Sequence, residues 1–101
     1  MAENEKRLLP QECTNISEVR NEIDHIDATI IKLLSTRFDY VREVVKYKEK
    51  TASGIEASDR RAAVIATRRQ WAEEAGLCPN VVENIYNTLI NYFIDEEKKL
   101  M

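Results

Sequence analysis

The chain has 101 residues, with 44% hydrophobic and 33% charged side chains, two Gly, two Pro and a formal net charge of −3. This length makes one domain with one core, and the composition fits a helical protein without strand-like alternation. Nucleic acid is excluded as a partner, because binding it needs a basic stripe that this mildly acidic chain lacks.

The chain begins with a polar segment, Met1 to Gln11, in which Pro10 disfavours a helix. We assign residues 1–14 to a flexible N-terminal segment and residues 15–101 to a helical domain. The charged start MAENEKRLL has no apolar core like that of a signal peptide, and no membrane span follows. We therefore expect a cytoplasmic protein with no membrane partner.

A long helix follows this segment. Asn15 and Glu18 have the spacing of a capping box, so the helix should begin near Ile16 and run to about Glu49. Steps of three and four residues trace a seam with nine apolar or aromatic positions out of ten: Ile16, Val19, Ile23, Ile26, Ile30, Leu33, Arg37, Tyr40, Val44 and Tyr47. Such a helix is about 50 Å long, whereas a compact monomer of this size has a radius of gyration of about 13 Å. We therefore predict an intertwined homodimer.

The cations of this helix predict a bound anion. Arg37 is the charged member of the seam, and Lys48, about three turns further on, should point nearly the same way. Arg20 precedes Arg37 by about 25 Å, so the two of one chain cannot hold one small ligand. In an antiparallel pair of helices, Arg20 of one subunit could approach Arg37 of the other. The alternative is a solvated Arg20, with Arg37 paired to an acid such as Asp39 or Glu43.

Two shorter helices should follow. The stretch Lys50–Ala57 is expected to form a loop, and Ser58 to cap a helix over Asp59–Ala75 that Gly76 terminates. Asn80 and Glu83 resemble another capping box, which would open a third helix ending near Lys99. A packed stripe of this helix is expected at Val82, Ile85, Tyr86, Leu89, Phe93 and Glu97.

The remaining reactive side chains give no site by themselves. Cys13 and Cys78 match no metal-binding spacing and are interpreted as two free thiols. His25 is the single histidine and cannot form a metal site alone. Arg60 and Glu97, taken alone, could both be surface residues.

The segment CTNISEVRNEIDHIDATIIKLLSTRFDYVREVVKYK closely resembles the all-helical chorismate mutase family. The resemblance lies in Arg20, the IDHID motif of residues 23–27, the pair Leu33 and Leu34, and then Arg37 and Lys48. RFDYV at residues 37–41 and RRQWAEEAGL at residues 68–77 are most similar to the isochorismate-pyruvate lyase branch, which forms salicylate.

The resemblance implies an intertwined homodimer of three-helix chains with two sites, each completed by the partner's first helix, without cofactor or metal. Arg37, with Arg20 from the other subunit, would hold the two carboxylates of the substrate. Lys48 would donate to the ether oxygen of the enolpyruvyl group, where negative charge grows as the C–O bond breaks. Arg60 would help to close the site.

Two positions depart from the family pattern. Glu97 stands where the family usually has a glutamine that donates to the same ether oxygen, so Glu97 would have to be protonated and activity should rise toward acid pH. Ala57 and Arg61 replace carboxylates that mutases commonly use to position the ring hydroxyl. Their loss favours the lyase.

The first hypothesis is therefore an isochorismate-pyruvate lyase, acting through a pericyclic step on a small dicarboxylate, with possible secondary mutase activity. The alternative is a chorismate mutase that makes prephenate with the same cations. A third hypothesis, from another class, is a non-catalytic dimeric helical module.

Overall fold

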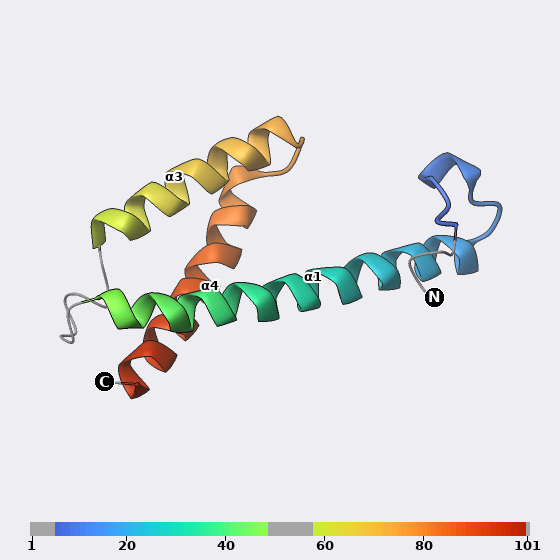
Figure 1. Ribbon diagram of the computed structural model, residues 1–101. Helices are drawn as coiled ribbons and strands as arrows, with labels where there is room; N and C mark the ends of the chain where they lie inside the picture. The colour runs from blue at the N-terminus through green and yellow to red at the C-terminus, as the bar shows by residue number, and fades with distance from the viewer. Residues whose placement is uncertain (1–5, 49–57, 101) are drawn as a thin grey trace. The chain divides into compact units, whose positions relative to one another are not determined.

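The structure, a computed structural model, describes residues 6–48 and 58–100. These ranges hold three α-helices, α1 (Ile16–Val44), α3 (Ser58–Glu74) and α4 (Pro79–Lys99), two short 3-10 helices, η2 (Pro10–Glu12) and η3 (Val45–Tyr47), and no β-strand (Figure 1). With 29, 17 and 21 residues, the α-helices confirm the prediction of an all-α chain with a long, a short and a medium helix. The predicted loop Lys50–Ala57 lies outside the described residues.

The chain divides into two compact units, residues 1–37 and residues 38–101, and the boundary falls within α1. The first unit contains η2 and most of α1. The second contains the last turns of α1, η3, α3 and α4.

In the first unit, residues 7–14 fold back on the start of α1. Pro10 is the first residue of η2 rather than a residue outside any helix, because its fixed φ and missing N–H suit the first position of a helical turn. The Leu9 N–H donates to Glu12 Oε1 at 2.7 Å, and Arg7 forms an ion pair with Glu22 at 3.8 Å. Local hydrogen bonds therefore give this polar segment a definite conformation.

The start of α1 at Ile16 agrees with the prediction, but only one of the two hydrogen bonds of the predicted capping box forms. The Glu18 N–H donates to Asn15 Oδ1 at 2.9 Å, as expected for an N-cap. The Glu18 carboxylate, however, accepts the Thr14 N–H at 2.8 Å and the Thr14 hydroxyl at 2.9 Å. Thr14 offers two donors, so the carboxylate closes a turn that begins one residue earlier.

The apolar seam of α1 is uncovered along the first unit. Its six side chains in this unit are between 41% and 63% exposed: Ile16, Val19, Ile23, Ile26, Ile30 and Leu33. Scattered apolar residues at a surface are ordinary, but a continuous stripe at helical spacing marks a surface that another molecule covers. Within the described residues the seam has no covering layer.

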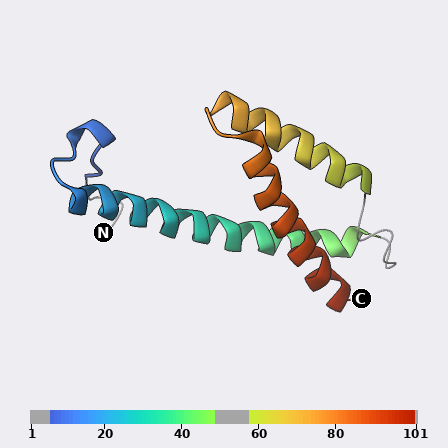
Figure 2. The same cartoon turned by 180° about the vertical axis from the view of Figure 1, so that it is seen from behind.

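In the second unit, α3 and α4 form an antiparallel pair, and the last turns of α1 cross α4 (Figure 2). Phe38 of α1 stacks on Phe93 of α4 with ring centroids 4.8 Å apart. The fully buried apolar side chains among the described residues are all here: Val45, Val64, Ala72 and Phe93. Glu97 is buried beside them, at 5% exposure, which confirms its predicted place on the packed side of the helix.

Gly76 ends α3, as predicted. Its φ of 76° lies in the left-handed region, where a side chain would be strained. The Leu77 N–H donates to the Ala72 carbonyl at 2.8 Å and the Gly76 N–H to the Glu73 carbonyl at 3.1 Å. This is the Schellman arrangement, and it turns the chain toward α4.

The predicted capping box of α4 is wrong. The N-cap is Cys78, and Pro79 occupies the first helical position, which its fixed φ and missing N–H suit. Asn80 and Glu83 are therefore inside the helix, and their side-chain oxygens accept from Arg69 Nη1 at 2.9 Å and 2.7 Å. They connect α4 to α3 instead of capping α4.

The end of α1 also differs from the prediction. The α-helix stops at Val44 and tightens into η3, and Lys48 follows with an extended backbone at φ −92° and ψ 152°. Lys48 is therefore not on the regular helix that the three-turn spacing from Arg37 assumed. A 3-10 turn is a common ending for an α-helix, and two β-branched residues, Val44 and Val45, weaken the α-helix locally.

Candidate active site

Lys48 and Glu97 form an ion pair in the second unit. Lys48 Nζ lies 2.9 Å from Glu97 Oε2, and the two side chains are 21% and 6% exposed. The residues are 49 positions apart, so the fold and not the local sequence brings them together. A buried carboxylate of this kind requires a cation or several donors, and Lys48 supplies both charge and hydrogen bond.

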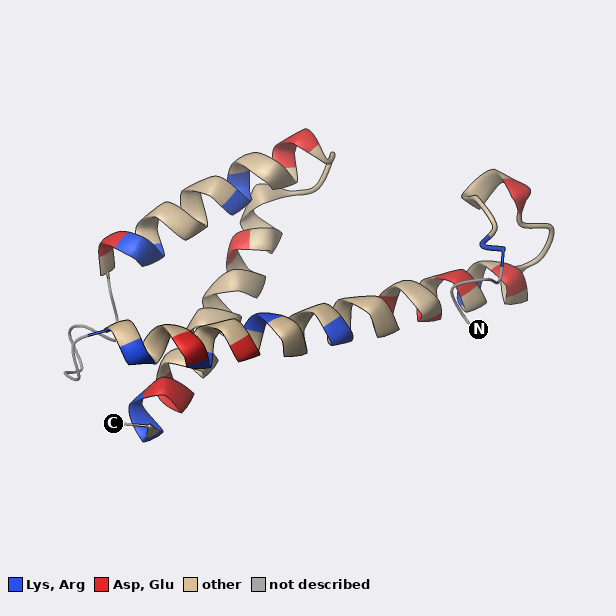
Figure 3. Cartoon of the chain, in the orientation of Figure 1, with Lys and Arg blue, Asp and Glu red and all other residues tan. Residues whose placement is uncertain are grey.

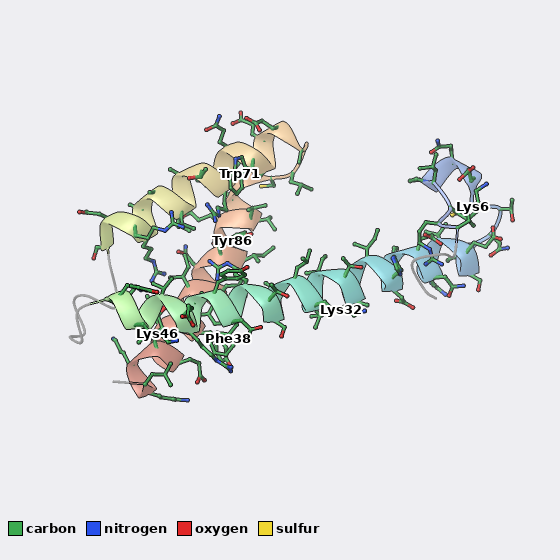
Figure 4. The ribbon with its side chains drawn as sticks, viewed as in Figure 1. Lys6, Lys32, Phe38, Lys46, Trp71 and Tyr86 are labelled. Carbon is green, nitrogen blue, oxygen red and sulfur yellow. The ribbon has the colours of Figure 1, made fainter. Side chains whose placement is uncertain are left out.

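The packed aromatic rings explain why Glu97 is held inside. Glu97 is four residues after Phe93 on α4. The Phe93 ring contacts Phe38, which is labelled in Figure 4, at 4.8 Å between ring centroids and Tyr92 at 5.3 Å. Arg42 covers the other side of this cluster, with its guanidinium carbon 4.1 Å from the Phe38 ring centroid. Since i and i+4 share a helix face, burial of Phe93 carries Glu97 into the interior.

The 3-10 helix η3 fixes the backbone position of Lys48. Val45, the first residue of η3, is buried, and its carbonyl accepts the Lys48 N–H at 3.3 Å. The side chain leaves this fixed turn and reaches α4. An ammonium group has three N–H donors, so a bond to Glu97 and a bond to a ligand oxygen can exist together.

A polar cleft of about 330 Å³ lies between the start of α3 and the C-terminal half of α4. It is lined by Ser58, Arg61, Asn91, Ile94, Asp95 and Lys98. Arg61 Nη2 donates to Asn87 Oδ1 at 3.2 Å, which fixes the guanidinium against α4. Figure 3 shows that charged residues of both signs gather at the start of α3.

Of the five residues predicted from the sequence, the described structure brings Lys48 and Glu97 into contact. Arg60 is exposed near the start of α3. Arg20 is exposed and Arg37 half-buried, and both lie on α1 in the first unit. Ala57, one of the two departures from the mutase pattern, lies outside the described residues. The other departure, Arg61, is half-buried and bonded to Asn87.

Sequence reasoning missed the two asparagines of α4 and the aromatic support under Glu97. Asn87 and Asn91 are spaced by four residues on one face of α4, which is the signal that could have found them. The stack of Phe38 on Phe93 joins residues 55 positions apart in the sequence, and no local pattern predicts it. Cys13 and Cys78 are free thiols, as predicted.

The described residues give no sign of a metal centre or a membrane span. No three His, Cys, Asp or Glu side chains among them gather as ligands. No helix in these ranges is both long enough and apolar enough to cross a bilayer.

The described residues thus form an all-α chain with a long, a short and a medium helix, and with a buried lysine–carboxylate pair between the end of the first helix and the last. Residues 19–98 match the family described as chorismate mutase type II, and the chain belongs to that family. The family and the relatives below place the chain among enzymes.

Three known proteins are similar in sequence to this chain. The isochorismate pyruvate lyase of Pseudomonas aeruginosa is 38% identical over 90 residues, which cover 89% of this chain and 88% of that protein. The T-proteins of Enterobacter agglomerans and Haemophilus influenzae are 31% and 33% identical over 70 residues. Those matches cover 69% of this chain but 19% of each T-protein. The resemblance to the chorismate mutase family seen in the sequence is thereby confirmed.

Proposed function

We propose that the protein is an isochorismate-pyruvate lyase, which converts isochorismate to salicylate and pyruvate. The observation that carries the proposal is the buried Lys48–Glu97 pair in a chain that is 38% identical, over most of its length, to an isochorismate pyruvate lyase. In the reaction the ether C–O bond breaks and a ring hydrogen moves to the methylene carbon of the enolpyruvyl group. No nucleophile and no external reagent are required for such a pericyclic step.

The active unit is an intertwined homodimer. The uncovered seam of α1, with side chains 41–63% exposed in the first unit, supports this assembly. Tyr40 and Tyr47 continue the exposed seam into the second unit at 71% and 83%. At roughly 25 cal/mol for each Å² of apolar surface buried, covering such a seam is a strong drive to associate.

Two arginines bind the carboxylates of the substrate. Arg37 holds one, and Arg20 of the partner subunit holds the other, because two arginines about 25 Å apart on one helix cannot share a small ligand. Guanidinium groups bind carboxylates in bidentate fashion, so the pair also fixes the orientation of the ligand. Arg60, on the first turn of α3, closes the site from the loop side.

Lys48 stabilises the ether oxygen as the C–O bond breaks. Its ammonium group donates to Glu97 and can donate to the ether oxygen at the same time, so the developing charge meets a fixed cation. In the unliganded structure Glu97 is an acceptor, since Lys48 donates to it. Glu97 helps the reaction as a second donor only when it is protonated, and it then gives up its role as counter-ion to Lys48.

Chorismate mutase is the second candidate function. The match to the chorismate mutase type II family favours it, because the same cations could hold chorismate. The lyase is preferred because Arg61 stands where mutases carry a carboxylate for the ring hydroxyl. Here its guanidinium is bonded to Asn87 and lines the cleft beside α4.

The two functions are separated by offering each substrate alone to the purified protein. The lyase proposal predicts salicylate fluorescence from isochorismate, with a kcat/KM at least tenfold above that for loss of chorismate absorbance. The reverse ratio would establish the mutase. Arg37→Ala with unchanged helical content should abolish turnover, and an unchanged biological function in that variant would instead favour a non-catalytic module.

A further inference from the structure

The polar cleft between the start of α3 and the C-terminal half of α4 is separate from the Lys48–Glu97 pair. It encloses about 330 Å³, and neither member of the pair lines it. At 100° per residue, Glu97 lies about 120° around α4 from Asn91 and about 160° from Asp95, and both of these residues line the cleft. The cleft and the ion pair therefore lie on different faces of α4, and no step of the proposed reaction uses the cleft.

Arg61 is the central cation of the cleft, and it has no carboxylate partner in the part of the chain that the structure describes. The residue is half-buried, and its Nη2 atom donates to the neutral side chain of Asn87 at 3.2 Å. A guanidinium group has five N–H donors, so one such bond leaves donors for a further acceptor. An anionic acceptor is favoured, because hydrogen bonds between two charged groups are the stronger ones.

Arg69, on the same helix, has the pairing that Arg61 lacks. Arg69 Nη1 donates to the Glu83 carboxylate at 2.7 Å and to the Asn80 side chain at 2.9 Å. Arg61 has the counterpart of the asparagine contact but not, within the described residues, that of the carboxylate contact. The contrast indicates that the carboxylate for Arg61 comes from another molecule.

The charges of the lining specify the kind of carboxylate. Lys98 adds a second positive charge, and Asp95 adds a carboxylate that has no hydrogen bond or ion pair inside the described ranges. The lining thus carries two cations and one anion, so a ligand with a single negative charge balances it. An ionised carboxylate only accepts hydrogen bonds, so Asp95 calls for a donor on the ligand. Figure 3 shows both signs of charge at the start of α3 and toward the end of α4.

We propose that this cleft binds a small hydroxycarboxylate. The carboxylate of the ligand accepts from Arg61, the ammonium group of Lys98 adds positive charge, and the hydroxyl of the ligand donates to Asp95. An amino acid fits less well, because its zwitterion brings no net negative charge. The inference goes beyond the proposed function and does not depend on it, since it concerns a site apart from Lys48 and Glu97.

The test is a titration of the full chain with L-lactate, followed by NMR through the side-chain amide signals of Asn87 and Asn91. These signals report on the cleft, because Asn91 lines it and Asn87 is bonded to Arg61. Both should shift and give the same dissociation constant. L-alanine and propionate have nearly the same size but replace the hydroxyl with an amino group or a hydrogen. Each should bind at least about threefold more weakly than lactate.

Variants assign the binding to the cleft. Arg61→Gln should weaken lactate binding at least about tenfold, and Lys98→Gln at least about fivefold, since each removes a positive charge from the site. Asp95→Ala should abolish the preference for lactate over propionate. Lys99→Gln is the matched control, because Lys99 is paired with Glu96 and does not line the cleft. Its dissociation constant should stay within about twofold of that of the wild type.

Helical content, measured by circular dichroism, should be the same in all four variants. The inference is overturned if the Asn87 and Asn91 signals do not respond to lactate, or if Arg61→Gln and Lys98→Gln bind lactate as the wild type does. Tighter binding of alanine or propionate than of lactate would also overturn it. None of these results bears on the turnover of isochorismate, so a failure of this inference is distinguishable from a failure of the proposed function.

Discussion

At the scale of single residues, the proposed chemistry rests on the contact between Lys48 and Glu97. The sequence alone suggested both residues as parts of a site, but it treated Glu97 as a donor to the substrate. At 2.9 Å from the lysine nitrogen, the carboxylate is an acceptor in the resting protein. The two roles exclude each other, because an ionised carboxylate has no proton to donate.

This conflict predicts the pH dependence of turnover. Wild-type kcat should rise as the pH is lowered from 8 to 5, because only a protonated carboxyl can donate to the ether oxygen. Glu97→Gln keeps an acceptor for Lys48 and gains a permanent donor, so its profile should be flat and its kcat at pH 8 at least that of the wild type. A flat wild-type profile that Glu97→Gln does not alter contradicts this role for Glu97.

A second residue-scale prediction concerns Glu18. The hydrogen bonds from the Thr14 N–H and hydroxyl hold the pKa of the Glu18 carboxyl below its usual value, against a smaller opposing effect of burial. Because the folded-state pKa is depressed, the stabilisation is present above the unfolded-state value of about 4.3 and is lost as the pH falls through the folded value. Glu18→Gln should therefore be less stable than wild type at pH 7 and equally stable at pH 2.

Urea unfolding at several pH values measures this difference. Glu73→Gln is the control, since the Glu73 side chain makes no hydrogen bond in the described ranges. A stability gap for Glu18→Gln that is constant from pH 7 to pH 2 would show that the Thr14 bonds do not act through ionisation.

At the scale of elements, local rules predicted the helices well and their ends less well. Gly76 and Asn15 were predicted correctly, because the cap residue itself determines the backbone or supplies the acceptor. The predicted N-cap at Asn80 was wrong, because Pro79 occupies the first helical position of α4 and the Asn80 side chain accepts a hydrogen bond from Arg69. The 3-10 end of α1 was also missed, because it depends on Val45 packing into a core that only the folded chain provides.

The turn at Gly76 gives a prediction for this scale. A Cβ atom at Gly76 would meet nothing within 4 Å, so the cost of Gly76→Ala arises from the left-handed backbone alone. It should destabilise the chain by about 1–2 kcal/mol, as measured by thermal or urea unfolding. Ala75→Gly, a change at a neighbouring position, serves as the comparison. A loss well above this range would mean that the turn has rearranged.

At the scale of the whole molecule, the sequence predicted a candidate anion site but not the contacts between helices around Lys48 and Glu97. The cations of α1 could be picked out from the sequence as candidate site residues, because a charge on an apolar seam is unusual. Arg61, Asn87 and the Phe38–Phe93 stack were not predicted, since they are contacts between helices far apart in sequence. The seam of α1, which was predicted as a packed face, is exposed within the described residues, and this exposure supports the proposed homodimer.

The central claim, that each site takes Arg20 from one chain and Lys48 from the other, is tested by subunit complementation. Arg20→Ala and Lys48→Ala should each lower kcat/KM at least about 100-fold when pure. When equal amounts are mixed and allowed to exchange, half of the dimers are mixed and each has one intact site. The account predicts recovery of about a quarter of wild-type activity on isochorismate. No recovery after proven exchange would contradict it.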